Sequence, residues 1–181
     1  AGFKLPLLHI ANSAAVIDLE KTYFDLVRPG IMLYGLLPSD ELRQEANLKP
    51  LLSFKTKIVQ LRKLPAGSAV SYGSIYITDS EEELAVLPVG YKDGYPRLLS
   101  NQGEVLINGQ RAPIRGRVCM GQTIVSVDQI EDVEVGDEVV LIGKQAKEEI
   151  SATEIADLCG TINYEIVCGL SERLEKIYFD Y

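Results

Sequence analysis

The chain has 181 residues, of which 46% are hydrophobic and 24% charged, as is typical of a globular protein with a sizeable core. The formal net charge of −8 argues against nucleic acid as a partner, because proteins that bind a phosphate backbone present a basic surface. Three cysteines without CxxC spacing indicate a reduced, cytoplasmic setting, and no apolar run reaches the roughly 18 residues of a membrane span.

The N-terminal residues have the pattern of an α/β unit. Residues 5–10 predict a buried strand, residues 13–19 a short helical turn, and residues 24–28 a second strand. Strand, helix and strand in this order build parallel sheets, in which ligand sites lie at the carboxyl ends of the strands. Because the pattern does not continue beyond the second strand, we expect this part to be a remnant of a larger α/β fold.

From Leu48 onward the chain has the pattern of an antiparallel β domain. Short apolar runs are bounded by turn residues such as Asn108-Gly109 and Gly136-Asp137. The predicted fold class is therefore a mainly β, barrel-like C-terminal domain preceded by the α/β remnant. The predicted strands cover residues 83–89, 103–107, 112–118, 122–130 and 137–142.

The C-terminal part adds one helix and one strand to this prediction. Ser151 and Glu154 have the Ser-x-x-Glu spacing of a capping box, which predicts a helix from about residue 152 to Gly160. The segment ERLEKIYF, residues 172–179, has the composition of a final strand. No internal repeat interrupts the pattern.

A polar stretch, residues 39–49, separates the α/β pattern from the β pattern. Polar segments of this kind are typical of domain boundaries. We predict an N-terminal domain of residues 1–42, which is incomplete, and a C-terminal β domain of residues 43–181.

Polar residues and a glycine follow both predicted N-terminal strands. Backbone N–H groups and a hydroxyl gathered there would surround an anion, for which phosphate is the usual occupant. The alternative is a strand-to-helix junction without a ligand, in which Ser13 is the N-cap and Arg28 forms a salt bridge. The residues concerned are His9, Asn12, Ser13, Arg28, Gly30 and Ile31.

Three of the nine tyrosines, Tyr72, Tyr91 and Tyr164, stand in polar, turn-like settings. A phenol, with an unperturbed pKa of about 10, acts as a base near neutral pH only where cations or donors stabilise the phenolate. The alternative for each tyrosine is a packed ring with a hydrogen-bonded hydroxyl. The arginines that we expect to supply a positive field are Arg97, Arg115 and Arg117.

Several other classes of site lack their motifs. The chain has one histidine and neither an HExxH motif nor a Cys/His cluster, so a zinc site is not predicted. Neither GxGxxG nor GxxxxGK[ST] is present, which argues against the common nucleotide-binding loops. Ser13 lacks the GxSxG elbow, and His9 lies too close to it in sequence to support a Ser-His-Asp site.

Six segments, taken in order, resemble the alanine racemase family: HIANSAA, DLVRPGIMLYG, AVSYG, LPVGYKDGYPR, GRVCM and GTINYE. The resemblance covers essentially the whole chain. It implies the last two strands of a (β/α)8 barrel that carries pyridoxal 5′-phosphate, followed by the complete C-terminal β domain. It also implies a homodimer with active sites shared between the subunits.

The resemblance implies a set of cofactor-binding residues. An arginine facing the pyridine nitrogen would donate a hydrogen bond but not a proton, so the nitrogen would stay unprotonated and the cofactor would be a weaker electron sink. The implied residues are Ser13, Gly30, Ile31 and Tyr164 at the phosphate, His9 and Asn12 beside it, and Arg28 at the pyridine nitrogen.

Racemisation removes a proton from one face of the α-carbon and returns one to the other, so two acid/base groups must flank this atom. In the family these are the cofactor lysine and a tyrosine of the neighbouring subunit, which matches Tyr72. The neighbouring subunit also supplies the counterparts of Met120, at the substrate carboxylate, and Tyr91. The implied residues at the substrate's entrance are Arg97, Arg117 and Ile162.

Two departures from the family pattern stand out. The strand with the cofactor lysine lies far upstream in the family, and none of Lys4, Lys21 and Lys49 stands in a matching context. We therefore expect the chain to be part of a longer racemase and to be inactive alone. Gly121 stands where the family usually has aspartate, so a carboxylate beside the substrate is lost.

The resemblance implies a racemase that interconverts L- and D-alanine in the cytoplasm, and so supplies D-alanine for the cell wall. A racemase of serine, or one of broad specificity, is the alternative within the same class. The alternative from a different class is a β domain that dimerises and performs no chemistry.

Overall fold

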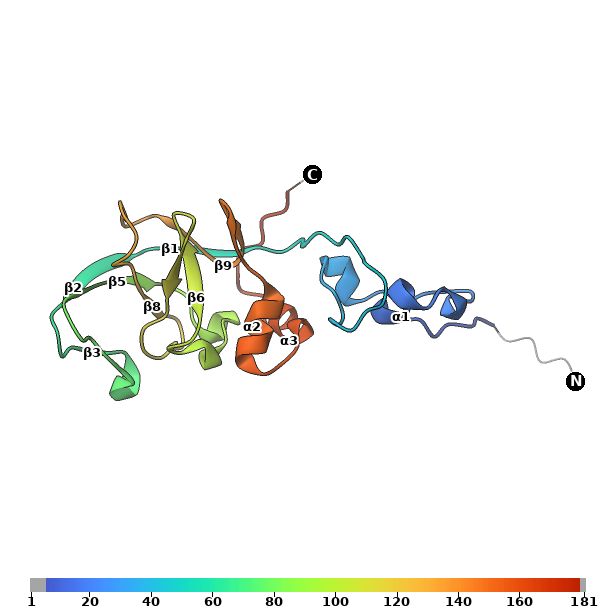
Figure 1. Ribbon diagram of the computed structural model, residues 1–181, viewed down its shortest axis with the longest axis horizontal. Helices are drawn as coiled ribbons and strands as arrows, with labels where there is room; N and C mark the ends of the chain where they lie inside the picture. Colours follow the sequence, from blue (N-terminus) through green and yellow to red (C-terminus); the bar gives the residue numbers. More distant parts are fainter. Residues whose placement is uncertain (1–5, 180–181) are drawn as a thin grey trace, which may run out of the picture. The chain divides into compact units, whose positions relative to one another are not determined.

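The structure is a computed structural model that describes residues 6–179. The chain divides into two compact units, the first ending at Leu52 and the second beginning at Ser53. Figure 1 draws the first unit in blue to cyan and the second from cyan through green to red. No helix among residues 6–179 is both long enough and apolar enough to cross a membrane.

The described residues of the first unit, 6–52, contain three short helical segments. The α-helix forms where we predicted a helical turn, because the Asn12 side chain caps it: its Oδ1 accepts a hydrogen bond from Ala15 N at 3.0 Å. The interpretation of Ser13 as the N-cap is therefore wrong. The segments are α1 (Ser13–Asp18) and the 3-10 helices η1 (Glu20–Thr22) and η2 (Ile31–Tyr34).

The two strands predicted in this unit are not formed among its described residues; Leu5, the first residue of the first of them, lies outside that part. The two segments do run side by side in the same direction, since Asp25 N donates to Leu8 O at 3.0 Å and Arg28 N to Ala11 O at 2.8 Å. Two such hydrogen bonds do not make a regular ladder, and each strand of a parallel sheet needs neighbours along its whole length.

The second unit is built almost entirely of short antiparallel strands. Its three 3-10 helices are η3 (Tyr72–Ser74), η4 (Tyr91–Asp93) and η5 (Arg97–Leu99). Its strands are β1 (Phe54–Lys57), β2 (Gln60–Leu64), β3 (Ala69–Val70), β4 (Tyr76–Ile77), β5 (Glu82–Leu87), β6 (Glu104–Ile107), β7 (Gln110–Pro113), β8 (Thr123–Ser126), β9 (Glu138–Gln145) and β10 (Glu148–Ile150).

The strands form two main sheets that join at both sides. One sheet has the order β1-β9-β6-β7, with β10 also on β9, the other has the order β2-β5-β8, and β3 pairs with β4. A bridge between Ile114 and Val125 connects β7 to β8, and only residues 58–59 separate β1 from β2. The barrel-like antiparallel fold class predicted from the sequence is confirmed.

The core of the second unit lies between these sheets. Strand β9 carries four consecutive buried residues, Val139–Ile142, and the central strand β6 buries Val105, Leu106 and Ile107 completely. A run of buried residues, rather than strict alternation, is what a strand covered on both faces requires. Functional residues are therefore expected on the loops that connect the strands of these sheets.

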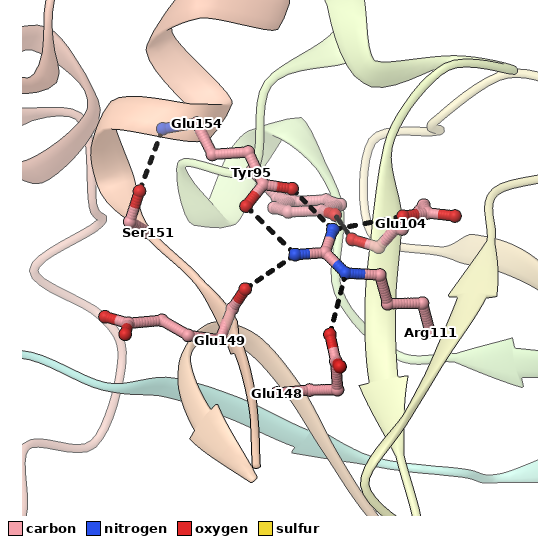
Figure 2. Close-up of polar contacts among 7 residues, drawn as sticks. All are labelled: Tyr95, Glu104, Arg111, Glu148, Glu149, Ser151 and Glu154. Atoms are coloured by element: carbon pink, nitrogen blue, oxygen red, sulfur yellow. Dashed lines mark hydrogen bonds and ion pairs between the residues drawn. The ribbon is translucent and has the colours of Figure 1, made fainter.

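The helix predicted from Ser151 is confirmed as α2 (Ala152–Cys159), and α3 (Asn163–Cys168) follows it. Ser151 Oγ accepts a hydrogen bond from Glu154 N at 3.0 Å, and Gly160 ends the helix in the left-handed conformation with φ of 66°. The Glu154 side chain binds Arg111, as Figure 2 shows, instead of reaching back to the cap.

Arg111 of β7 ties α2 to the sheet through a cluster of acidic groups (Figure 2). Its guanidinium donates to Glu154 Oε1 at 2.6 Å and to the Glu149 carbonyl at 2.7 Å. These hydrogen bonds, the one to Glu154 above all, raise the pKa of Arg111. Further hydrogen bonds, each of 3.1 Å, reach Glu104 on β6 and Glu148 on β10.

The C-terminal strand predicted at residues 172–179 is wrong, because these residues have no strand partner in the described part of the chain. Three predicted strands also end earlier than expected: 83–89 ends as β5 at Leu87, 112–118 as β7 at Pro113 and 122–130 as β8 at Ser126. In the predicted strand 112–118, Gly116 adopts a positive φ of 76° that turns the backbone away from an extended path, so β7 does not continue to residue 118.

Candidate functional site

The Ser13 hydroxyl joins the two loops of the first unit. Ser13 is 3% exposed, and its Oγ accepts hydrogen bonds from Gly30 N at 2.8 Å and Met32 N at 3.5 Å. Among the described residues this hydroxyl donates to no acceptor, so its hydrogen is available to an anion. A Cβ at Gly30 would meet only Ser13 Oγ, at 3.8 Å, and would fill the space beside the hydroxyl.

Arg28 and His9 lie exposed on the same unit. The Arg28 guanidinium contacts the Ile10 carbonyl at 3.5 Å and forms no ion pair within residues 6–179, so the salt-bridge interpretation is wrong. Ile31 is buried, with 3% of its surface exposed, whereas Asn12, which caps the helix of Ser13, is exposed, so the exposed polar groups of these loops are His9, Asn12 and Arg28. A phosphate and a ring nitrogen are groups that such an arrangement can bind.

Tyr72 stands on a sharply bent turn of the second unit. The residues around it, Ser71, Gly73 and Ser74, have positive φ values of 64°, 73° and 46°. The Tyr72 side chain is 76% exposed and makes no hydrogen bond within the described part of the chain. The direction of the Tyr72 side chain is therefore set by the backbone of the turn and not by hydrogen bonds of the phenol.

The turn that carries Tyr72 packs against the segment Arg117–Met120. Ser71 Oγ donates to the Arg117 carbonyl at 2.8 Å, and a Cβ at Gly73 would lie 3.2 Å from Arg117 Nε. The Arg117 guanidinium thus lies beside the turn that carries Tyr72. Met120, at the end of the segment, is 59% exposed.

The loop Gly90–Gly94, which carries Tyr91, lies flat on the same segment. Tyr91 N donates to the Cys119 carbonyl and Lys92 N to the Met120 carbonyl, each at 3.0 Å. A Cβ at Gly90 would stand 2.1 Å from the Cys119 carbonyl oxygen, so only glycine permits this approach. The exposed side chains of Tyr72, Met120 and Tyr91 thus come from three adjoining pieces of backbone.

The buried side chain of Asp93 holds this loop in place. Its side chain is 2% exposed, Oδ2 accepts from Gly90 N at 3.0 Å, and Oδ1 accepts from Arg173 Nε at 2.9 Å. The pairing of Asp93 with Arg173 was missed by the sequence analysis, because the two residues stand 80 positions apart and share no motif.

Arg115, one of the three arginines expected to supply a positive field, contacts Glu82 and Tyr76. Its Nε donates to Glu82 Oε1 at 2.9 Å, and its guanidinium lies 4.7 Å over the Tyr76 ring. Tyr76 donates its hydroxyl to Glu82 Oε2 at 2.7 Å, and burial together with this bond raises the pKa of Tyr76 to about 12. This trio is a closed structural cluster, which leaves Arg117 as the arginine at the Tyr72 turn.

Three further predicted residues lie on other elements of the second unit. Arg97 is exposed on η5, and Ile162 precedes α3 with 61% of its surface exposed. Tyr164 lies half-buried in the first turn of α3.

Gly121 leaves room that the Lys92 side chain occupies, since a Cβ at position 121 would meet Lys92 Nζ at 2.6 Å.

Comparison with protein families gives two matches that follow each other along the chain. The model of the alanine racemase N-terminal domain matches residues 1–38, and the model of the alanine racemase C-terminal domain matches residues 51–178. The first match agrees with the barrel remnant predicted from the sequence.

Curated relatives carry the same name. The alanine racemase of Halothermothrix orenii is 58% identical over 174 residues, which are 96% of this chain and 46% of that protein. The alanine racemase of Carboxydothermus hydrogenoformans is 54% identical over 98% of this chain and 48% of its own length. The chain spans about half the length of these relatives.

Solved structures agree with the relatives. The crystal structure of alanine racemase from Bacillus anthracis with bound L-Ala-P is 43% identical, has a TM-score of 0.90, and covers 96% of this chain and 45% of its own. Alanine racemase from Streptomyces coelicolor is 38% identical with a TM-score of 0.92 over 99% of this chain and 47% of its own. The chain therefore belongs to the alanine racemase family.

Proposed function

We propose that this chain is the C-terminal part of a pyridoxal-phosphate-dependent racemase that interconverts L- and D-alanine. We call the polypeptide that also contains the upstream barrel the parent racemase. The observation that carries the proposal is the Tyr72 phenol, 76% exposed and without a hydrogen-bond partner among the described residues, on a turn fixed beside Met120 and Arg117. An unpaired phenol held by rigid backbone is suited to exchange a proton with a ligand.

The residues of the first unit suit pyridoxal phosphate. When bound, this cofactor supplies an electron sink that makes the α-hydrogen of an amino acid acidic. The free hydroxyl hydrogen of Ser13 and the space beside Gly30 fit a phosphate oxygen. We assign Ser13, Gly30, Ile31 and Tyr164 to the phosphate, with His9 and Asn12 beside it.

Arg28 is assigned to the pyridine nitrogen. Its guanidinium is exposed and forms no ion pair in the described part of the chain, so it is available for a ligand. Because arginine keeps its proton, it can donate a hydrogen bond to the nitrogen without protonating it. By holding the nitrogen unprotonated, Arg28 would make the bound cofactor a weaker electron sink, which would restrain side reactions.

Tyr72 is assigned to one face of the substrate's α-carbon. It takes the proton from one enantiomer, or returns it to the other, while the upstream cofactor lysine serves the opposite face. Arg117 places a positive charge beside the turn. The exposed Met120 and Tyr91 adjoin Tyr72 and are assigned to substrate binding, with Arg97, Arg117 and Ile162 at the entrance.

The parent racemase is proposed to act as a homodimer in the cytoplasm, with Tyr72, Met120 and Tyr91 of one subunit completing the site around the partner's cofactor. Two features support this. All three residues belong to the second unit, whereas the cofactor residues other than Tyr164 belong to the first. Their side chains are exposed in the isolated chain, as surfaces that meet a partner are.

The proposal is tested by replacing Tyr72 with phenylalanine in the parent racemase and measuring racemisation of L- and D-alanine, and of both serine enantiomers. Removal of the phenol hydroxyl should lower kcat by about 10²- to 10⁴-fold in both directions. Tyr178→Phe is the matched control, because this phenol is 87% exposed, belongs to the same unit and has no assigned role. Unchanged turnover of Tyr72→Phe would remove Tyr72 from the mechanism.

A further inference from the structure

Ser71 has a backbone conformation that only glycine adopts freely. Its φ of 64° and ψ of −176° lie outside the regions open to residues with a Cβ. A serine in this conformation is strained, and strain of this kind persists only where the surroundings enforce it.

The Ser71 side chain supplies the restraint. Its Oγ donates a hydrogen bond to the Arg117 carbonyl at 2.8 Å and lies 3.2 Å from Cys119 Sγ. In the loop between β7 and β8, Gly116 comes so close that a Cβ would lie 2.5 Å from the Val70 carbonyl oxygen. The strained residue is thus clamped to the segment that also carries Met120.

Glycine at position 71 would give the same turn without strain, but it would lack the hydroxyl. Tyr72, the next residue, has no side-chain contact that sets its direction: 76% of its surface is exposed and its phenol has no hydrogen-bond partner among residues 6–179. The direction of the phenol therefore depends on the backbone that Ser71 holds.

We infer that Ser71 is a positioning residue for Tyr72. The Ser71 hydroxyl fixes the strained turn against the Arg117–Met120 segment and so directs the Tyr72 phenol toward the substrate. This inference rests on the proposed role of Tyr72 as an acid/base group. It also explains the strain: serine supplies the hydroxyl that holds the turn, whereas glycine would relax the backbone but would lack this hydroxyl.

Three substitutions at position 71 in the parent racemase separate the hydroxyl from the strain. Ser71→Gly removes both, Ser71→Ala removes only the hydroxyl, and Ser71→Thr keeps the hydroxyl at a β-branched residue that tolerates positive φ poorly. We expect kcat to fall about 10- to 100-fold in the Gly and Ala variants, with KM little changed, and to be largely kept in the Thr variant.

Thermal stability should follow a different order. The Gly variant should melt above the Ala variant, because it lacks the strain, and the Thr variant should melt below the wild type. Activity then follows the hydroxyl while stability follows the strain. If kcat instead follows the melting temperature across the three variants, Ser71 is merely structural and the inference is wrong.

Two controls and a double mutant complete the test. Ser74→Gly changes a serine of the same turn with φ of 46° and no hydrogen bond from its hydroxyl in the described part, and Cys119→Ala removes the sulfur contact. Both should retain more of kcat than Ser71→Gly. In the pair Ser71→Gly with Tyr72→Phe, kcat should equal that of Tyr72→Phe alone, because Ser71 acts through Tyr72.

The outcomes distinguish the two proposals. If Tyr72→Phe is as active as the wild type, both the role of Tyr72 and that of Ser71 are wrong. If Tyr72→Phe is inactive while Ser71→Gly keeps its kcat, or if the two substitutions add in the double mutant, only the inference about Ser71 is wrong. The double mutant decides the matter even where Ser71→Thr does not fold.

Discussion

The carboxyl group of Glu82 shows how a single buried charge is made tolerable. Its side chain is 8% exposed, and burial by itself acts to raise the pKa of Glu82. Hydrogen bonds from Ser126, Tyr76 and Arg115 outweigh burial, so this pKa is lowered. The ionised form is therefore the form that the folded protein favours.

A consequence is a defined pH dependence of stability. Because the pKa of Glu82 is lower in the folded than in the unfolded protein, its contribution is present above the unfolded pKa and is lost as the pH falls through the folded pKa. We expect Glu82→Gln to lower the melting temperature at neutral pH, and the difference from the wild type to shrink as the solution is acidified. Glu83→Gln is the control, since its pair with Lys63 is exposed and 3.9 Å long.

The Asp93–Arg173 pair gives a second prediction for single residues. Asp93 is 2% exposed, so Arg173→Met would leave a buried carboxylate with the Gly90 N–H but without a cation. We expect a loss of about 2 kcal/mol in the free energy of unfolding, less than for a fully buried pair because Arg173 is 55% exposed. Lys55→Met, at an exposed pair with Glu138, should cost less than about 1 kcal/mol. A smaller loss at Arg173 than at Lys55 would contradict the prediction.

Sequence patterns predicted elements well where the cause of the element is local. The helix after Ser151 was predicted with its boundaries, because its cap lies three residues from the amide that it binds. The segments 5–10, 24–28 and 172–179 were predicted as strands from composition, but a strand also needs a partner, which composition does not reveal. Neither Ser71 nor the Asp93–Arg173 pair had a signal, since strain and long-range pairing appear only in three dimensions.

The cluster around Arg111 links α2 to β6, β7 and β10 (Figure 2). One guanidinium holds Glu104, Glu148 and Glu154, which belong to three different elements. In Arg111→Met these carboxylates lose their shared cation and repel one another. We expect a loss of about 2 kcal/mol in stability, smaller at high salt because the groups are partly exposed.

The control for this prediction is Arg62→Met, an exposed arginine of β2 without an ion pair in the described residues. Urea unfolding at low and high salt measures both variants. Equal stability of Arg111→Met and Arg62→Met would show that the cluster adds nothing.

The fold class itself was predictable because every strand of the second unit pairs with another strand of that unit, so its pattern is complete within this chain.

At the scale of the whole molecule, the residues proposed for the substrate belong to the second unit, and those proposed for the cofactor, other than Tyr164, belong to the first. Ser13, Gly30 and Arg28 belong to the first unit, and Tyr72 and Met120 to the second. The site residues were identified by the family resemblance, whereas spacing alone did not distinguish a phosphate site from a strand-to-helix junction without a ligand. Their joint function, and the predicted domain boundary after residue 42, stay proposals.

The last prediction concerns sharing of sites between subunits of the parent racemase. Two inactive variants are mixed and allowed to exchange subunits: Tyr72→Phe, and one without the upstream cofactor lysine. If Tyr72 serves the partner's cofactor, each hybrid dimer has one site with both acid/base groups and one with neither. Random pairing makes half of the dimers hybrids, so about a quarter of wild-type activity should return. If Tyr72 acts within its own chain, every site in the mixture lacks one group, and the mixture should stay inactive even when subunit exchange is demonstrated with differently labelled chains.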